Sequence, residues 1–360
     1  MKLLLQPGSG IAPLLSGIKK ARSSVQIMIF RFDRREIEKA LIDAVGRGVS
    51  VQALIAYTNR GGEQNLRDLE MRLLESGITV TRTAGDLVRY HAKMMIIDKR
   101  EAYILGFNFA FMDIERSRSF GVITTNAKIV REAVKLFEAD VKRQPYEPGC
   151  AAFVVSPENA RQELSAFING AKRELLVYDP KIADRQMIRL LEARAAAGVD
   201  VRVIGKISRN ESQLPVHQLD NMRLHTRSMI RDGKIIFVGS QSLRTAELEA
   251  RREAGIVFSD AKHAARMRKI FEEDWASRKE VEDTGKKNIT ITARKVAKKF
   301  SKRITKNLGS VGSVLADIVQ EVVGDEHRVE VDPVELEHEV RDRIHEVVQE
   351  LVENAVEEHQ

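Results

Sequence analysis

The sequence predicts an α/β protein made of two similar halves, each a mixed β-sheet flanked by helices. Apolar, strand-like runs alternate with segments whose apolar residues recur at helical spacing, which is typical of helices packed on a sheet. The same order of segments occurs twice in the 360 residues, and a differently composed segment follows. We therefore expect two lobes, at residues 1–145 and 150–280, and an α-helical C-terminal extension at 285–360.

The first half contains a strand, a helix and a second strand in close succession. Val25–Phe30 is an almost continuous apolar run, which indicates a buried strand. Residues 34–45 repeat apolar side chains at helical spacing, and residues 49–56 return to a strand-like pattern. This order predicts a helix that covers one face of a sheet.

The second half repeats this plan after a linker at Pro145–Gly149. Ser156 precedes Pro157, a combination that predicts the start of a helix with a side-chain cap. The next elements are then expected to be a strand, a helix and a strand, at residues 175–178, 183–197 and 201–204.

A repeated motif links the two halves. His91-Ala92-Lys93 with Asp98 matches His225-Thr226-Arg227 with Asp232, at a constant offset of 134 positions. The same offset aligns Arg118 with Arg252, Gly121 with Gly255, Phe137 with Phe271, and Asp140 with Asp274. A unit of about 140 residues is too long for a solenoid repeat, whose periods are ~20 to 50 residues. The repeat therefore indicates duplication of a small domain.

Composition narrows the class of protein. With 43% hydrophobic and 31% charged residues, the chain is typical of a soluble globular protein, and its formal charge of +7 favours an anionic partner such as a phosphodiester. Cys150 is the only cysteine, which excludes a disulfide framework and a thiolate metal cluster. Met1–Leu5 is too short for a signal-peptide core, and no run approaches ~18 apolar residues. We expect a cytoplasmic protein, with attachment to a membrane surface as an alternative.

The C-terminal extension is basic first and acidic later. Residues 286–306 contain nine Lys or Arg and no acidic residue, with apolar residues at helical spacing, which predicts a basic amphipathic helix. Asp332-Pro333 begins a second, acidic helical segment. Two interpretations stay open: self-association or packing through these helices, and docking of 286–306 on an anionic membrane.

The repeated motif has the chemistry of phosphoryl transfer. His91 and Lys93 are two residues apart, so in a strand both side chains lie on one face. A histidine that attacks or protonates, beside a fixed cation, supplies both the nucleophile and the neutralising charge that an anionic phosphate requires. Asp98 and Asp232 fall where the strand turns, so although they belong to the candidate catalytic motif, their position favours a turn and hydrogen-bonding role.

These residues resemble the phospholipase D superfamily, whose signature HxKxxxxD, then six residues, then GSxN occurs twice in a chain. The resemblance covers about residues 1–280. Asn108 fits the signature in the first copy, and Gly239-Ser240 fits it in the second. The chain departs from the signature at Leu105-Gly106, which replace Gly-Ser, at Ser242, which replaces Asn, and at Arg227, which replaces Lys.

The resemblance implies a mechanism without metal or cofactor. One histidine attacks phosphorus to form a phosphohistidine, and the other protonates the leaving alcohol. Both half-sites must then face one pocket, with Asn108, Ser240 and Ser242 as candidates to bind or orient the phosphate. An acidic residue often orients a histidine in this family, and Glu253 is expected to do so for His225, because the matching position of the first copy is Ser119. On that basis His91 is expected to be the nucleophile and His225 the acid.

The expected function is a phospholipase D-type phosphodiesterase or phosphatidyltransferase that acts on phospholipids. Two alternatives remain: a metal-independent nuclease of the same superfamily, and a catalytically degenerate relative that binds lipid or protein. The basic segment at 286–306 suits an anionic bilayer and a nucleic-acid backbone equally. The nuclease is less favoured because aromatic residues form only 5% of the chain, which leaves few stacking platforms for bases.

Overall fold

The computed structural model describes residues 1–57, 63–208, 213–219 and 221–277. These belong to one compact unit, Met1–Arg278, which contains both repeated halves. The expected helices of 285–360, including the basic segment, lie outside the described residues and stay a prediction.

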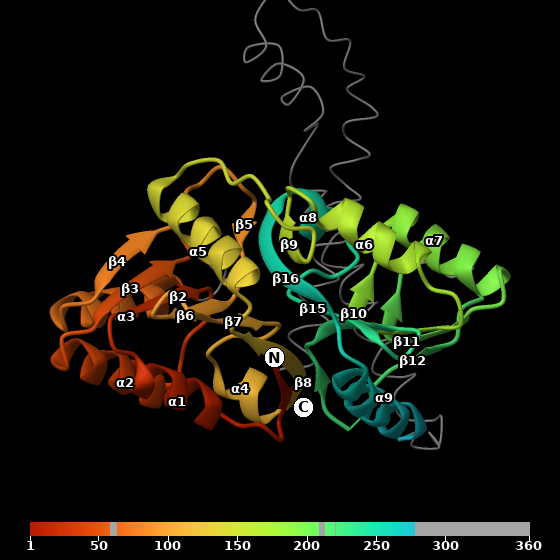
Figure 1. The fold of residues 1–360 in the computed structure, drawn as a ribbon, viewed down its shortest axis with the longest axis horizontal. Helices are drawn as coiled ribbons and strands as arrows, with labels where there is room; N and C mark the ends of the chain where they lie inside the picture. The colour runs from red at the N-terminus through yellow and green to blue at the C-terminus, as the bar shows by residue number, and fades with distance from the viewer. Residues whose placement is uncertain (58–62, 209–212, 220, 278–360) are drawn as a thin grey trace, which may run out of the picture. The chain divides into compact units, whose positions relative to one another are not determined.

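The first lobe alternates strands and helices as the sequence predicts (Figure 1). Its strand and helix at residues 24–46 match the expected pattern within one residue at each end. The elements of this lobe are β1 (Lys2–Gln6), α1 (Ala12–Lys20), β2 (Ser24–Ile29), α2 (Arg35–Gly46), β3 (Ser50–Ile55), α3 (Glu63–Glu75), β4 (Thr79–Arg82), β5 (Arg89–Tyr90), β6 (Met94–Ile97), β7 (Glu101–Leu105), α4 (Phe111–Glu115), β8 (Ser117–Thr124) and α5 (Ala127–Lys142).

The second lobe repeats this order without a counterpart of α3 among the described residues. Its elements are β9 (Phe153–Ser156), α6 (Ala160–Asn169), β10 (Glu174–Ile182), α7 (Arg185–Ala196), β11 (Asp200–Ile207), β12 (Val216–His217), β13 (Arg223–Leu224), β14 (Arg227–Arg231), β15 (Ile235–Gly239), α8 (Thr245–Glu249), β16 (Arg251–Ser259) and α9 (Ala261–Ala276).

One predicted element boundary is wrong. Ser156 and Pro157 do not start a helix, because Ser156 is the last residue of β9 and pairs with Glu253 of β16. The helix α6 begins four residues later, at Ala160, and Asn159 accepts the Val155 N–H rather than a helical one. The local Ser-Pro pattern is therefore overridden by pairing of the preceding strand within the sheet.

The two sheets have the same strand order. The first runs β1-β8-β7-β6-β2-β3-β4, and the second runs β9-β16-β15-β14-β10-β11-β12. In each sheet a parallel pair, β2 with β3 or β10 with β11, adjoins an antiparallel pair that carries the repeated motif. Helices cover both faces of the central strands. The side chains on both faces are therefore buried, which explains the continuous hydrophobic runs in these strands.

Each sheet also receives a two-residue strand from the other lobe. β5 of the first lobe pairs in parallel with β16, and β13 of the second lobe pairs in parallel with β8. These are the strands that lead directly into His91 and His225. Each motif histidine is therefore positioned by the last strand of the opposite lobe.

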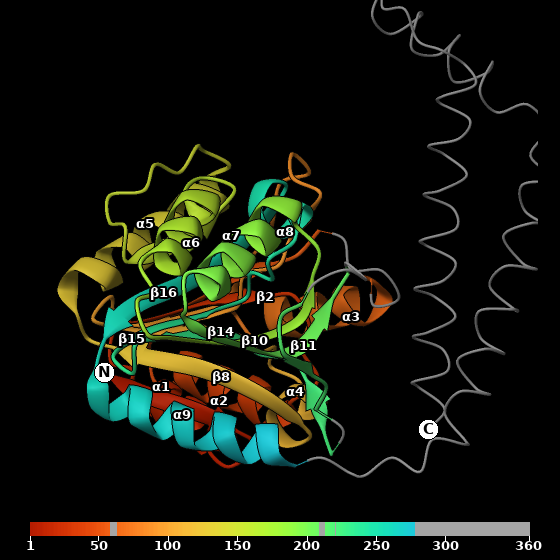
Figure 2. The ribbon, with the colours of Figure 1, turned by 90° about the vertical axis from the view of Figure 1, so that its right-hand side faces the viewer.

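The helices form two layers, one on each side of the strands (Figure 2). In that view α5 of the first lobe is on the same side of the strands as α6 and α7 of the second lobe. The other side has α1 and α2 of the first lobe and α9 of the second. A core is shared between the lobes here: the Phe120 ring of β8 meets Tyr178 of β10 edge-on, with ring centroids 5.4 Å apart. Tyr178 in turn packs on Phe271 of α9 at 5.0 Å.

Candidate active site

Backbone hydrogen bonds between the lobes hold both motif histidines. The His91 N–H donates to the carbonyl oxygen of Arg252 in β16, at 2.8 Å. The His225 N–H donates to the carbonyl oxygen of Arg118 in β8, at 3.1 Å. The two bonds are related by the 134-residue repeat, so the half-sites are joined by a local pseudo-twofold arrangement. Both histidines are buried, with exposed fractions of 8% and 6%.

The first half-site places a carboxylate and an ammonium against one imidazole. Glu253, which is completely buried, lies 2.9 Å from Nδ1 of His91 through either carboxylate oxygen. The Lys93 Nζ lies 2.8 Å from Nδ1 and 2.7 Å from Nε2 of the same ring. The Phe30 ring meets the imidazole edge-on, with centroids 4.5 Å apart. His91 is therefore held from three sides.

The expectation that Glu253 orients His225 is wrong. Glu253 contacts His91 because β16 pairs not only with β15 of its own motif but also, on its other side, with β5, the strand that precedes the first histidine. The matching position also lies beside the other lobe's histidine: Ser119 is in β8, which pairs with β13, the strand that precedes His225. The second histidine consequently lacks a carboxylate at the place where the first has one.

The second half-site contains an acidic residue that our sequence reasoning missed. Asp113 of α4 lies 3.5 Å from Nε2 of His225 and accepts a hydrogen bond from Arg223 at 2.7 Å. It also accepts the backbone N–H of Asn108 at 2.8 Å and its side-chain amide at 2.6 Å. A signal was available, because the 134-residue offset aligns Asp113 with Glu247, another acidic residue.

Arg227 is held in place by its own lobe. Its Nη1 donates to the carbonyl oxygen of His225 at 2.7 Å, and its Nε donates to Oγ of Ser242 at 3.1 Å. The N–H of Ser242 donates to Glu247 at 2.7 Å, which repeats the contact between Asn108 and Asp113. Ser242 thus orients the guanidinium, and Ser240 bonds to the backbone of Ala254 across the β15–β16 pair.

Asp98 and Asp232 lie at the hairpin turns and not beside the imidazoles. Both have a φ of 53°, and the next residues, Lys99 and Gly233, also have positive φ, the backbone conformation that a tight type I′ turn requires at two successive residues. Asp98 accepts backbone N–H groups from Arg22, Ser23 and Ser24. Asp232 accepts the equivalent groups at residues 172–174. Each motif aspartate therefore ties its hairpin to the start of the neighbouring strand, which is β2 in the first lobe and β10 in the second.

Burial and neighbouring cations favour neutral imidazoles. Burial lowers the pKa of both His91 and His225 well below the usual value, and Lys93 and Arg227 lower both further. At His225 the Asp113 carboxylate opposes this and raises the pKa. Burial lowers the pKa of Lys93 to about 7 and raises that of Glu253. The cation of each half-site also lowers the pKa of the other half-site's histidine, as expected for charges that lie near one another.

The lobes also approach closely at Gly106, a glycine of the first motif. A Cβ at Gly106 would lie 2.8 Å from the carbonyl oxygen of Gly239, in the other lobe, and 2.9 Å from that of Phe120. Both neighbours are backbone atoms and cannot move aside without shifting a strand. This contact gives a physical reason for glycine at 106, one of the positions that departs from the family signature.

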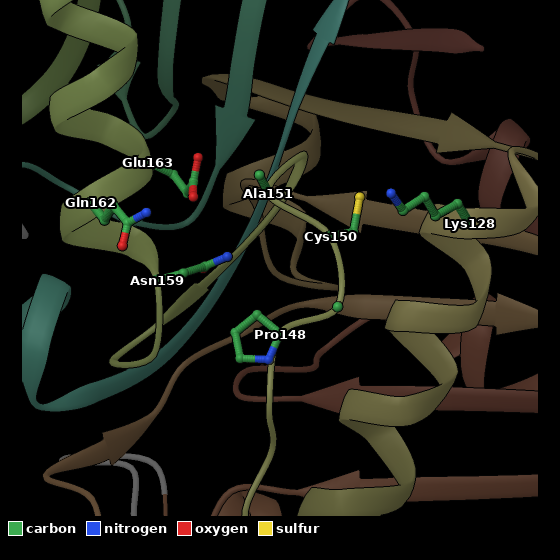
Figure 3. A pocket seen from close by; sticks show the side chains of 8 residues that line it. Lys128, Pro148, Cys150, Ala151, Asn159, Gln162 and Glu163 are labelled. Carbon is green, nitrogen blue, oxygen red and sulfur yellow. The ribbon is translucent and has the colours of Figure 1, made fainter.

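A separate hollow of about 430 Å³ lies at the linker between the lobes (Figure 3). Residues 148–151 form one wall, Lys128 of α5 lies at one side, and Asn159 with α6 lies at the other. None of the motif residues lines it. It is therefore distinct from the two half-sites.

Two lobes of this fold, each with a motif histidine that is held by the last strand of the other lobe, define a phospholipase D-like protein. The family model described as cardiolipin synthase, PLD-like domain, matches residues 14–141 and 164–275. The chain therefore belongs to this family.

Individual relatives agree with this assignment at low identity. Cardiolipin synthase 1 of Bacillus cereus is 23% identical over 344 residues, which span 78% of this chain and 67% of the relative. Among solved structures, a phosphatidylserine synthase of Haemophilus influenzae has a TM-score of 0.58 at 10% identity and covers 77% of this chain and 86% of its own.

A polyphosphate kinase of Porphyromonas gingivalis has a TM-score of 0.63 at 20% identity. The match covers 78% of this chain but only 52% of the kinase chain, so this protein spans about half of that relative. Both structural likenesses concern the fold. Within the residues that the structure describes, no helix is long and apolar enough to cross a membrane.

Proposed function

We propose that this protein is a phosphodiesterase or phosphatidyltransferase of the phospholipase D type, which acts on phospholipids at a single site between its lobes. The observation that carries the proposal is the placement of His91 and His225, each pinned by the other lobe and each beside a fixed cation. Two buried histidines with two cations suit an anionic phosphorus centre, whose charge Lys93 and Arg227 would neutralise.

His91 is the better nucleophile. Glu253 accepts the proton of Nδ1, so the lone pair of a neutral imidazole is on Nε2, the nitrogen that would attack phosphorus. The Lys93 ammonium lies beside Nε2, and an incoming phosphate oxygen would attract this ammonium away from the imidazole. A nitrogen–phosphorus bond then forms as the bond from phosphorus to the leaving alcohol breaks. The sequence also predicts His91 as the nucleophile, although Glu253 lies at His91 and not at His225.

His225 is the proton donor in this proposal. Asp113 raises its pKa against the effect of burial, and an anionic phosphate in the pocket would raise it further. Its proton passes to the leaving alkoxide oxygen. Water or a second alcohol then gives a proton back to His225 and displaces His91 from phosphorus, which restores both groups. Asn108 and Ser242, which position Asp113 and Arg227, support the phosphate-binding groups.

A phospholipid is the favoured substrate because the family model and the Bacillus relative are named for cardiolipin synthase. An alcohol acceptor would make the reaction a transfer, and water would make it hydrolysis. Such a substrate brings the protein to a membrane surface, for which the basic segment 286–306 is our proposed attachment. Self-association through the later helices remains the competing role for the extension.

One assay tests the function against its alternatives. Full-length protein would be incubated separately with phosphatidylglycerol, cardiolipin, phosphatidylcholine and single-stranded DNA, each with excess chelator. We expect cleavage or exchange of an anionic phospholipid that is unchanged by chelator, because side chains supply all the charges. Cleavage of DNA alone would establish the nuclease alternative. Binding of lipid without turnover would identify a degenerate relative.

A vesicle assay tests the extension. The full chain and a version that ends at residue 284 would be sedimented with phosphatidylglycerol vesicles, after both are checked for cooperative unfolding. We expect weaker binding by the shorter protein, and a smaller difference at high salt because ions screen the attraction. Equal binding by two folded proteins would rule out this role for 286–306.

A further inference from the structure

The position beside Nδ1 of each motif histidine is equivalent in the two half-sites but carries a different side chain. Nδ1 of His91 has the Glu253 carboxylate at 2.9 Å. The counterpart of Glu253 at the 134-residue offset is Ser119 of β8. The carbonyl group just before Ser119 in the chain accepts the N–H of His225, as the one just before Glu253 accepts that of His91. Ser119 therefore lies beside His225 where Glu253 lies beside His91.

The polar atoms at this position of the second half-site are buried. Ser119 is completely buried and His225 is 6% exposed. Neither Oγ of Ser119 nor Nδ1 of His225 has a hydrogen-bond partner among the described residues. Buried polar groups in proteins are nearly always hydrogen-bonded, and a bond through one water molecule is nearly as good as a direct one. The Ser119 hydroxyl is thus available to Nδ1, either directly after rotation of the side chain or through one bridging water.

A carboxylate and a hydroxyl differ in what they can do for an imidazole nitrogen. An ionised carboxylate only accepts hydrogen bonds, so Glu253 fixes a proton on Nδ1 of His91 and leaves the lone pair on Nε2. A hydroxyl or a water molecule both donates and accepts, so it can bond to Nδ1 of His225 whether or not that nitrogen carries a proton. The second histidine can therefore change its protonation without losing a buried hydrogen bond, whereas the first is held in one tautomer.

The charged groups around His225 do not fix Nδ1 in one state. They come from four different elements and are Asp113 of α4, Arg223 of β13, Arg227 of β14 and Lys93 of β6. The cations among them are donors and cannot accept a ring proton. The carboxylate of Asp113 lies 3.5 Å from Nε2, so it favours a proton on that nitrogen and not on Nδ1. The neutral His225 ring therefore favours the tautomer opposite to that of His91.

We propose that the side chain beside Nδ1 assigns the two histidines their roles: Ser119 is a positioning residue that lets His225 gain and lose a proton, and Glu253 fixes His91 as the nucleophile. This inference rests on the proposed function. In the resting protein Nε2 of His225 carries the proton, and Nδ1 accepts a hydrogen bond from the hydroxyl or the bridging water.

The same group serves the later states of His225. When the ring takes up a second proton from solvent, Nδ1–H donates to the hydroxyl or the water, whose lone pairs are free to accept. Nε2 then gives its proton to the leaving oxygen, and the neutral ring that remains keeps its proton on Nδ1. Nε2 is thereby free to take a proton from the attacking water or alcohol, which restores the protonated ring.

The tautomers of the two imidazoles test this inference without turnover. Full-length protein with isotope-labelled histidine would be studied by NMR at neutral pH, with His91→Gln and His225→Gln to assign the signals. We expect the proton on Nδ1 in His91 and on Nε2 in His225. Ser119→Glu, which copies the other half-site, should move the His225 proton to Nδ1. Ser119→Thr keeps a hydroxyl, so it is the control and should leave the proton on Nε2.

An exchange of the two residues tests the assignment of roles. Bis(p-nitrophenyl) phosphate has a leaving group that needs little protonation, so it can form an adduct without the acid. After rapid denaturation, mass spectrometry of peptides would locate the adduct. We expect it on His91 in the wild type and mostly on His225 in the double variant Ser119→Glu/Glu253→Ser.

A second pair of variants serves if the glutamate at 119 prevents folding in a thermal melt. Ser119→Val has the shape of Ser119→Thr without its hydroxyl, and on phosphatidylglycerol it should be about tenfold slower, because a hydrogen bond to the charged ring is lost. Equal rates for this pair, a His225 tautomer unchanged by Ser119→Glu, or an adduct that stays on His91 in the folded double variant would each overturn the inference. The expected tautomers without adduct or cleavage in the wild type would instead refute the proposed function alone.

Discussion

His91 and His225 occupy equivalent positions in the repeat, yet their surroundings differ at single residues. His91 has Glu253 at Nδ1, whereas Nδ1 of His225 has no hydrogen-bond partner among the described residues, and Ser119 stands at the place of the glutamate. His225 has Asp113 near Nε2 instead. The imidazoles are therefore prepared for unequal roles, and the difference comes from individual side chains on a common backbone.

The first residue-scale prediction concerns this difference. Glu253→Gln should lower kcat by on the order of 100-fold, because the neutral amide binds the Nδ1 proton less strongly than a carboxylate, and its NH2 group can donate to Nδ1 and favour the wrong tautomer. Ser119→Ala, the matched change at the other histidine, should cost much less. Steady-state hydrolysis of bis(p-nitrophenyl) phosphate measures both. Equal losses in the two variants would show that Glu253 has no special role in orienting His91.

A second prediction follows from the pKa of about 7 for Lys93, whose ordinary value is 10.5. Between these values the unfolded state holds a proton that the folded state lacks, so this group makes stability rise with pH. Wild type should therefore gain stability relative to Lys93→Met by ~1 kcal/mol per pH unit above pH 7. Urea unfolding at pH 7, 8 and 9 measures the difference. A constant difference would mean that Lys93 stays charged in the folded protein.

At the scale of elements, two ion pairs that the repeat relates to each other join the lobes. Arg118 of β8 pairs with Asp274 of α9 through two hydrogen bonds of 2.8 and 2.7 Å. Arg252 of β16 reaches Asp140 of α5 at 3.1 Å. Each last strand thus binds the last helix of the other lobe, at positions that the 134-residue repeat aligns. The repeat of these arginines and aspartates in the sequence therefore reflects the interface between the lobes, in addition to the repeated histidine motif.

Removal of one of these arginines should destabilise the joined lobes. Arg118→Met leaves Asp274 buried without its guanidinium, so we expect a loss of about 3–5 kcal/mol in the free energy of unfolding. Lys99→Met, which breaks an exposed pair with Glu138, is the control and should cost less than about 1 kcal/mol. Urea denaturation of the two variants gives both values. A small loss at Arg118 would show that the lobes hold together without this pair.

The glycine contact between strands gives a further prediction at this scale. Gly106→Ala should lower activity by about tenfold or more, since its methyl group meets the backbone of the other lobe and small displacements of catalytic groups are costly. Gly46→Ala, at the end of α2 with open space around it, should leave activity unchanged and stability equal or slightly higher. The same kinetic assay and thermal melts compare them. Full activity of Gly106→Ala would contradict a strict spacing of the lobes.

At the scale of the whole molecule, the proposed function requires one site made from two lobes. Single substitutions His91→Ala and His225→Ala should each abolish nearly all activity on phospholipid, by on the order of 1000-fold or more, because the groups act in sequence on one phosphate. Trapping with radiolabelled substrate should detect a covalent adduct in His225→Ala when the leaving group is good, and none in His91→Ala. If each variant kept half the rate, the lobes would work independently. An adduct on His225 would reverse the assigned roles.

The repeat, the alternation of strands and helices, and the identity of both histidine motifs could be read from the sequence, because they depend on local patterns. Apolar periodicity identifies buried strands such as Met94–Ile97, and duplication reveals the motif residues without knowledge of their contacts. The turn role of Asp98 and Asp232 followed from their position in a hairpin in the same way.

Only the tertiary structure decided which residues of one lobe serve the other. Glu253 is far from His91 in the chain, and its pairing depends on β5 crossing to β16, a contact between two residues of each strand that no local pattern announces. Asp113 lies beside His225 through the corresponding crossing of β13 to β8. Local sequence specifies elements through short-range packing, whereas the partners at this site are set by long-range strand pairing between the duplicated halves.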